Sequence, residues 1–425
     1  MNVIGWARRC LAGLAAGALF VANACAATGP AAAAGPADVQ ALQSLIDATP
    51  TGGTLKLPAG RYAGPVRIER SLTLIGEPGT QVQGSGKGSV IHVKARDVRI
   101  EGLDISGSGT DVPAMDAAVL LEQSATGAVV RSNRLHGNLF GVYVHGAADA
   151  RIERNTIVGR SDLRMSEAGD GVSIWNAPGT EVTGNTILHG RDGIFVKISR
   201  RNVFADNTFR ELRFGIHYMY THDSRIVGNR SRGNHVAWAI MYSERIELTD
   251  NVSDDDRDHG LMLNTTNASK VVGNVVRGGH EKCIFVYNAN NNVLRENWFE
   301  GCPIGMHFTA GSEGNTVSGN AFIGNRSQVK YVGTRFVDWG KGGRGNYWSD
   351  NPAFDLDGDG TADRPYRPND VMDQVLWTLP AAKALANSPA VQIVRWAQAK
   401  FPALYPGGVI DSAPLMRPVR TPPRP

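Results

Sequence analysis

Short runs that alternate apolar with other residues recur along most of this chain. Residues 193–196, 260–263 and 283–286 are examples, and each run ends after a few residues. Gly or Asn interrupts the pattern too often for helices of ten or more residues. The pattern therefore predicts short β-strands, repeated about every 22 residues.

One Asn marks each repeat. From Asn185 onward its intervals are 22, 22, 22, 23, 23 and 23 residues, through Asn207, Asn229, Asn251, Asn274, Asn297 and Asn320. Fixed self-similarity of this length is typical of stacked-repeat proteins, and the dense leucine frame of leucine-rich repeats is absent. We predict an all-β fold, a right-handed parallel β-helix with coils about 4.8 Å apart. The Asn side chains should form an inward ladder of amide hydrogen bonds.

The start of the chain has the pattern of a secretory signal peptide. Residues 1–27 combine a basic start at Arg8 and Arg9 with an apolar run and small residues at the end. The formal charge of the whole chain is +4, and no basic tract is present, so nucleic acid is not an expected partner. We expect an exported protein.

The same period gives the domain organisation. Asn155 and Asn185 are 30 residues apart, so the surplus in 160–169 predicts a loop that bulges from one coil. Helical spacing near the mature start predicts a helix that caps the open end of the sheets. We assign a signal peptide to 1–27, a capping helix to 37–50, the β-helix to 54–340, a Trp- and Asp-rich loop to 341–368, and a helical and extended tail to 369–425.

Two columns of the repeat are predicted to point outward, because the positions between them are apolar nearly everywhere. They bring His217, Met219, Met241 and Met262, here called the His–Met patch, onto three successive coils. Neighbouring side chains would lie roughly 5–7 Å apart. Thioether and imidazole donors suit a soft ion, Cu(I) above all. His259 and His222, in flanking turns, are further candidate ligands.

Other interpretations of these residues stay open. Outward Met side chains also pack under loops or against partner proteins, because Met adapts to irregular surfaces. A second grouping of His235, His280, Cys283 and Cys302 lies in adjacent turns at less regular offsets. The two cysteines can pair in an oxidising compartment or stay as buried thiols.

Exported β-helices also include polysaccharide lyases and C5-epimerases, which need a base, a charge neutraliser and an acid in one groove. Residues 254–259 are the dense carboxylate cluster of the chain, but no ladder of outward Arg or Lys accompanies it. We therefore expect a protein that is not an enzyme, with a lyase or epimerase as the alternative.

An Asp-rich loop follows the last repeat. Asp355, Asp357, Asp359 and Asp363 occupy positions 1, 3, 5 and 9 of a calcium-loop pattern, and Thr361 would offer its carbonyl at position 7. Position 12 is Tyr366 rather than the usual Glu. The pattern predicts structural Ca²⁺.

The tail contains an amphipathic helical pattern. Ile393, Val394, Ala397 and Phe401 fall on one face, with Trp396 at its edge. We expect this face to pack back on the β-helix. Docking to a partner at a membrane surface is the alternative.

Seven segments, in order, make the chain similar to the NosD family of periplasmic maturation proteins for nitrous oxide reductase: 214–224, 256–264, 282–292, 306–315, 328–335, 345–360 and 388–403. The resemblance implies a periplasmic protein that works with an ABC transporter permease, its cytoplasmic ATPase and a copper-chaperone lipoprotein. It implies a role in assembling the copper–sulfide centre of the apo-reductase, with Cu(I) as transient cargo and with attachment to the membrane through the permease. It assigns no copper ligand, and it leaves open whether the cargo is copper, sulfur or both. A docking scaffold without metal is a further alternative.

Overall fold

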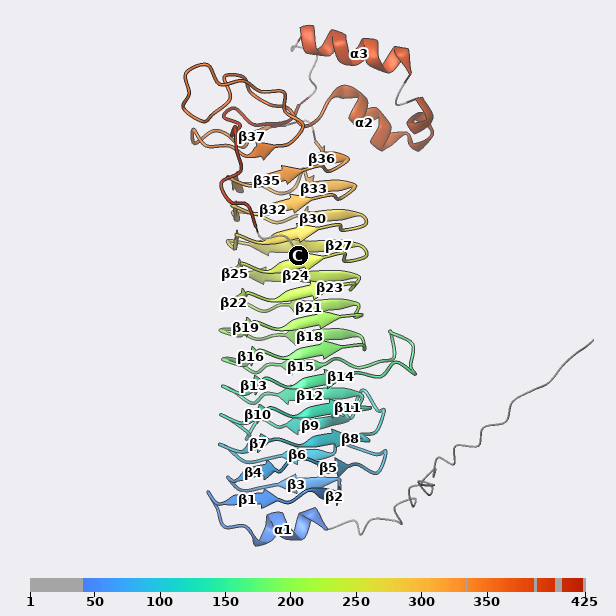
Figure 1. The fold of residues 1–425 in the computed structure, drawn as a ribbon, viewed down its shortest axis with the longest axis vertical. Coiled ribbons are helices and arrows are strands. Elements are labelled where there is room, and N and C mark those ends of the chain that lie inside the picture. Colours follow the sequence, from blue (N-terminus) through green and yellow to red (C-terminus); the bar gives the residue numbers. More distant parts are fainter. Residues whose placement is uncertain (1–40, 334, 386–387, 402–406, 423–425) are drawn as a thin grey trace, which may run out of the picture. The chain divides into compact units, whose positions relative to one another are not determined.

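The computed structural model describes residues 41–333, 335–385, 388–401 and 407–422. The predicted signal peptide lies outside the described residues. From residue 54 the chain winds into a parallel β-helix, as the Asn period predicts, and the coils stack in one column (Figure 1). Among the described residues, no helix combines the length and the apolar character that crossing a bilayer requires.

Each full coil contributes one strand to each of three parallel sheets. The first sheet consists of β1 (Thr54–Leu57), β4 (Thr73–Gly76), β7 (Arg99–Glu101), β10 (Val129–Arg131), β13 (Arg151–Glu153), β16 (Glu181–Thr183), β19 (Val203–Ala205), β22 (Ser224–Val227), β25 (Ile246–Thr249), β28 (Lys270–Val272), β31 (Val293–Arg295) and β34 (Thr316–Ser318). The second sheet consists of β2 (Gly60–Ala63), β5 (Thr80–Gln83), β8 (Asp104–Ser106), β11 (Arg134–His136), β14 (Thr156–Val158), β17 (Thr186–Leu188), β20 (Thr208–Arg210), β23 (Arg230–Arg232), β26 (Val252–Asp254), β29 (Val275–Arg277), β32 (Trp298–Glu300), β35 (Ala321–Ile323) and β38 (Tyr347–Trp348).

The third sheet carries the candidate site. It consists of β3 (Val66–Ile68), β6 (Ile91–Val93), β9 (Ala117–Leu121), β12 (Phe140–His145), β15 (Val172–Trp175), β18 (Asp192–Lys197), β21 (Phe214–Met219), β24 (Val236–Glu244), β27 (His259–Asn267), β30 (Lys282–Tyr287), β33 (Ile304–Thr309) and β36 (Ser327–Val332). Between β14 and β15 the chain leaves the column as a loop, as the 30-residue interval predicts (Figure 1).

The predicted Asn ladder is confirmed. Asn185 Nδ2 donates to Asn207 Oδ1 at 3.0 Å, and Asn207 repeats the bond to Asn229 at 3.0 Å. The same bond links every neighbouring pair from Asn133 to Asn346. These amides are buried, so each rung satisfies polar groups that would otherwise be unpaired inside the coil.

The ladder ends on a carboxylate. Asp411 Oδ2 accepts from the Asn346 amide nitrogen at 2.7 Å, from its Nδ2 at 3.2 Å, and from Trp348 Nε1 at 2.8 Å. A carboxylate only accepts, so it leaves no donor without a partner at the end of the ladder. Asp411 follows β39 (Gly408–Ile410), which pairs with β37 (Phe336–Asp338), so the tail closes the last coil.

At the other end, α1 (Leu42–Ala48) buries Leu42 and Ile46 against the first coil, and this helix is the predicted cap. Gln43 covers the open edge of β3: its Nε2 donates to the Arg67 carbonyl at 3.1 Å, and its Oε1 accepts from the Arg67 N–H at 2.8 Å. A side-chain amide thus takes the place of a neighbouring strand and blocks edge pairing.

The C-terminal helices contradict one prediction. After α2 (Val371–Thr378) and a 3₁₀ turn (Pro380–Leu385) comes α3 (Pro389–Lys400), whose apolar face was expected to pack on the β-helix. That prediction is wrong, because Ile393, Trp396 and Phe401 are 65%, 62% and 60% exposed. The opposite face is held instead: Arg395 pairs with Asp370 at 2.8 Å, which turns the apolar face outward.

Candidate metal centre

The strand register places the His–Met patch on neighbouring strands. His217 on β21 is paired with Ala239 on β24, and Ala239 is paired with Met262 on β27. Met219 is paired directly with Met241. Three thioethers and one imidazole therefore lie within three adjacent strands of the third sheet.

These side chains point away from the core. Ile216 and Tyr218, on either side of His217, are buried inside the coil, so alternation puts His217 on the outer face. His217 is nonetheless only 8% exposed, whereas the three Met side chains are partly exposed.

Ala239 occupies the middle of the patch. It is fully covered although it points outward, so its neighbours close over it. His217 and Met262 lie two strands apart, about 9–10 Å at the usual strand spacing. The side chains of His217 and Met262 can approach each other across that distance because Ala239, which lies between them, is small.

His217 is anchored by a buried carboxylate. Its Nδ1 lies 3.0 Å from Asp192 Oδ2, and Asp192 on β18 is completely buried. Arg213 donates to both oxygens of Asp192, at 2.9 and 2.7 Å. Phe195 and Phe214 contact the imidazole at centroid distances of 4.9 and 4.8 Å. Burial acts to raise the pKa of Asp192, but the hydrogen bonds from His217 and Arg213 outweigh it and lower that pKa below its ordinary value.

Sequence reasoning missed Asp192 and Arg213. Asp192 occupies the position just before the small-residue marker of its repeat, Gly193, and only the four positions after that marker were assigned to faces. The signal was present: Asp170 and Arg191 stand 22 residues before Asp192 and Arg213, and Arg191 makes the same two bonds to Asp170, at 3.0 and 3.1 Å.

The structure places the two flanking histidines differently. His259 begins β27, and its ring contacts Phe285 at 5.9 Å. Its Nδ1 is buried without a hydrogen-bond partner in the described part of the chain, and burial lowers its pKa. His222 Nδ1 accepts the backbone N–H of Glu244 at 3.2 Å, so that nitrogen is engaged in the turn.

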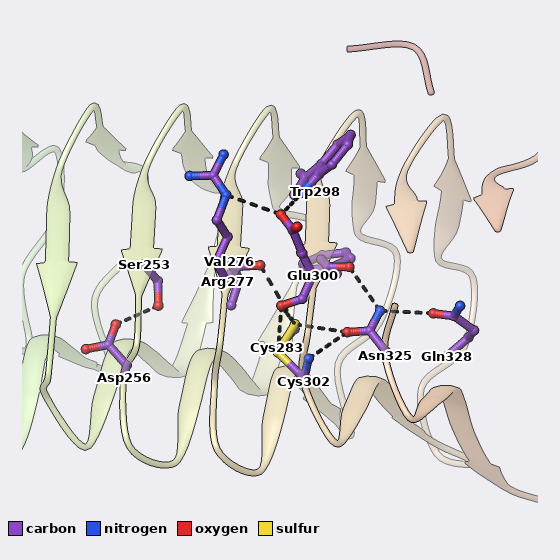
Figure 2. Close-up of a disulfide and its surroundings, with 11 residues drawn as sticks. Ser253, Asp256, Val276, Arg277, Cys283, Trp298, Glu300, Cys302, Asn325 and Gln328 are labelled. Atoms are coloured by element: carbon purple, nitrogen blue, oxygen red, sulfur yellow. Dashed lines mark hydrogen bonds and ion pairs between the residues drawn. A yellow bond between two sulfur atoms is a disulfide. The ribbon is translucent and has the colours of Figure 1, made fainter. Parts of the chain in front are cut away.

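Cys283 and Cys302 form a disulfide (Figure 2). A metal site based on their thiolates, together with His235 and His280, is therefore excluded in this oxidised state. His235 Nδ1 instead lies 3.1 Å from Asp258 Oδ2. The bond fits an oxidising compartment.

The carboxylate cluster at 254–259 does not converge on a groove. Asp256 points into the coil, where Ser253 Oγ donates to its Oδ2 at 2.6 Å (Figure 2). Burial raises the pKa of Asp256 to about 7. Asp254 pairs with Arg277 at 3.6 Å on the outer side, and Asp258 faces His235. These carboxylates are engaged in holding adjacent coils together.

The Asp-rich loop brings three carboxylates together. Oxygens of Asp355, Asp357 and Asp363 lie within 4.8 Å of one another. Asp355 accepts backbone N–H groups of Gly358 at 2.6 Å and of Gly360 at 2.9 Å. These bonds lower the pKa of Asp355, the bond from Gly360 most of all. Hard oxygen donors in this arrangement fit Ca²⁺.

Comparison with known proteins identifies relatives along most of the chain. Residues 154–353 match the family described as periplasmic copper-binding protein (NosD). A probable ABC transporter binding protein NosD of Stutzerimonas stutzeri is 37% identical over 376 residues, covering 85% of this chain and 86% of the relative. The protein of the same description from Pseudomonas aeruginosa is 38% identical over 386 residues, covering 88% and 90%.

Among solved structures, the surface adhesin PfbA of Streptococcus pneumoniae is similar in fold. Its TM-score is 0.56 at 11% identity, and the match covers 69% of this chain and 87% of the adhesin. An identity this low supports the β-helix fold alone.

Proposed function

The chain belongs to the NosD family of periplasmic copper-binding proteins, and we propose that it carries Cu(I) at the His–Met patch and delivers it for assembly of the copper–sulfide centre of nitrous oxide reductase. The observation that carries this proposal is the register of β21, β24 and β27, which gathers one imidazole and three thioethers around Ala239. Soft donors of this kind prefer Cu(I) to hard divalent ions.

The patch has the properties of a transfer site. Met219, Met241 and Met262 are partly exposed, so an incoming ligand can reach an ion held there. Thioethers are neutral and never protonated, so release requires only exchange of one neutral ligand for another. We propose that a copper-chaperone lipoprotein loads the patch and that the apo-reductase unloads it.

An apolar corner beside the patch supports exchange with a protein. Ile198, Tyr220 and Tyr242, here called the corner ridge, are 48%, 46% and 41% exposed, and the two Tyr rings stack at 5.1 Å. All three have φ near +50°, and the same corner of neighbouring coils has the smaller polar residues Asn176, Thr265 and Asn288. Bulky residues in this left-handed region cost about 1–2 kcal/mol each, and these three leave much of their apolar surface exposed, where a partner can reach it. We propose that the copper-exchanging partner docks here.

The exposed apolar face of α3 supports a second contact. Ile393, Trp396 and Phe401 form an exposed apolar surface on a helix held by its opposite face. We propose that this face docks on the permease of the ABC transporter, whose ATPase lies in the cytoplasm. Structural Ca²⁺ at Asp355, Asp357, Asp359, Thr361 and Asp363 would stabilise the loop that precedes α2.

A competition titration with a Cu(I) chelator tests the copper proposal. Met219→Leu/Met241→Leu removes two donors while keeping volume and apolar character, so we expect normal folding and weaker Cu(I) binding. Ala239→Leu keeps every donor but places a bulky side chain between them, and it should weaken binding as well. Met416→Leu, a methionine outside the patch, is the matched control.

The outcomes separate the candidate functions. If Met219→Leu/Met241→Leu and Ala239→Leu both bind Cu(I) as tightly as the wild type, copper binding at the His–Met patch is refuted. Absence of Cu(I) binding by the wild-type protein would favour a metal-free docking scaffold.

A further inference from the structure

We propose that Asp192 is a positioning residue that holds His217 in the tautomer protonated on Nδ1, so that the lone pair of Nε2 faces the thioethers. The consequence for copper rests on the function proposed above. The tautomer itself is a property of the metal-free protein.

The hydrogen bonds around Asp192 define the direction of the proton. Arg213 donates through Nε to one carboxylate oxygen and through Nη2 to the other, at 2.9 and 2.7 Å. Asp192 is thereby an acceptor at both oxygens, and an ionised carboxylate has no proton to donate. The 3.0 Å contact with His217 Nδ1 is then an N–H donated by the imidazole. In a neutral imidazole, the other nitrogen carries the lone pair.

The position of Asp192 also sets where Nε2 points. Asp192 lies on the preceding strand, nearer its start: its register partner on β21 is Phe214, three residues before His217. The ring directs Nδ1 back along that diagonal. Nε2 is on the side of the ring away from Asp192, and we infer that it is directed toward β24. Met241 lies in that direction, two residues beyond Ala239.

A second buried Arg–Asp pair, 22 residues earlier in the chain, shows that this two-bond interaction forms without an imidazole. Arg191 makes the same two bonds to Asp170, which is also completely buried. Asp170 has no histidine among its hydrogen-bond partners in the described part of the chain, whereas Asp192 has His217. A carboxylate behind a metal-binding imidazole is a recurring way to fix the ring and raise its basicity. Asp170→Asn is therefore the comparison variant: it removes the neighbouring buried carboxylate but leaves the bonds of Asp192 to Arg213 and its contact with His217 in place.

Long-range ¹H–¹⁵N spectra of histidine-labelled, copper-free protein report the tautomer directly. We expect His217 to be protonated on Nδ1 in the wild type and in Asp170→Asn. In Asp192→Asn the amide can either accept from or donate to Nδ1, so a mixture is expected. Cu(I) affinity should fall about 10–100-fold in Asp192→Asn and stay unchanged in Asp170→Asn.

Two results would overturn the inference. One is a wild-type His217 protonated on Nε2. This measurement requires neither a folded variant nor bound copper. The other is unchanged affinity in Asp192→Asn under conditions where Met219→Leu/Met241→Leu loses it. If the Met variant also keeps its affinity, the copper site fails, and the metal-free tautomer still decides the role of Asp192.

Discussion

Replacing Asp256 by Asn should stabilise this protein, increasingly so as the pH rises. Asp256 follows Asn234 by one coil and accepts its backbone N–H at 2.8 Å, as an Asn would. Ser231 Oγ donates to Oδ1 at 3.0 Å, and Ser253 Oγ donates to Oδ2 at 2.6 Å. An Asn can keep the first two bonds through its carbonyl and donate to the Ser253 hydroxyl, without a buried charge.

The magnitude follows from the raised pKa. Burial raises the pKa of Asp256 from 3.8 to about 7 in the folded state. The folded protein therefore holds the proton more tightly than the unfolded chain. The contribution of this bound proton to the stability of the folded state is complete below pH 4 and is lost as the pH rises through 7. The loss is about 2 kcal/mol at pH 5 and about 4 kcal/mol at pH 8. Asp256→Asn should recover these amounts.

Urea unfolding at pH 5 and pH 8 measures both differences. Asp255→Asn is the matched control, because the neighbouring Asp255 is exposed and loses the same charge without changing a buried group. An advantage of Asp256→Asn that does not grow between the two pH values would refute the reasoning. So would an equal gain in the Asp255→Asn control.

Three further predictions concern the loop, the corner ridge and α3. A calcium chelator should lower the melting temperature of the wild type but not that of Asp355→Asn/Asp357→Asn; a wild-type midpoint that does not move would mean that the loop binds no calcium. Tyr220→Ser/Tyr242→Ser should keep Cu(I) affinity but slow transfer to the apo-reductase about tenfold, as expected for loss of aromatic anchors. Tyr287→Ser, exposed further along the same face, should transfer normally, and equal rates in all three proteins would contradict the docking proposal. Ile393→Glu/Trp396→Glu should abolish co-purification with the permease, whereas Gln392→Glu should not; retention by the first variant would exclude α3 as the contact.

The regular coils could be predicted because each repeat has the same buried polar groups to satisfy. Every coil must pair the polar groups of one inward turn, and an Asn does this at a fixed interval. The last rung, Asn346, escaped detection because the chain leaves the column after β36 and returns 26 residues beyond Asn320. Asp411, 65 residues further on, could not be found by periodicity at all, since tertiary folding alone brings it to the end of the ladder.

The candidate site, too, could be predicted only in part from the repeat. Alternation along strands was enough to place His217, Met219, Met241 and Met262 on one outer face, because strand register follows from the repeat. It gave no account of Asp192, which reaches His217 diagonally from the neighbouring strand.

The α3 helix shows a related limit. Its periodicity identified the apolar face but not the direction in which that face points. Pairing of Arg395 with Asp370 and Asp373 on the opposite side sets that direction.

X-ray absorption spectroscopy of the Cu(I)-loaded protein tests the central claim most directly. We predict a copper ion bound by one imidazole nitrogen and by thioether sulfurs. The sulfur contribution should fall in Met219→Leu/Met241→Leu, and the imidazole contribution should vanish in His217→Ala. A spectrum dominated by oxygen or nitrogen, or one that both variants leave unchanged, would contradict copper binding at the His–Met patch.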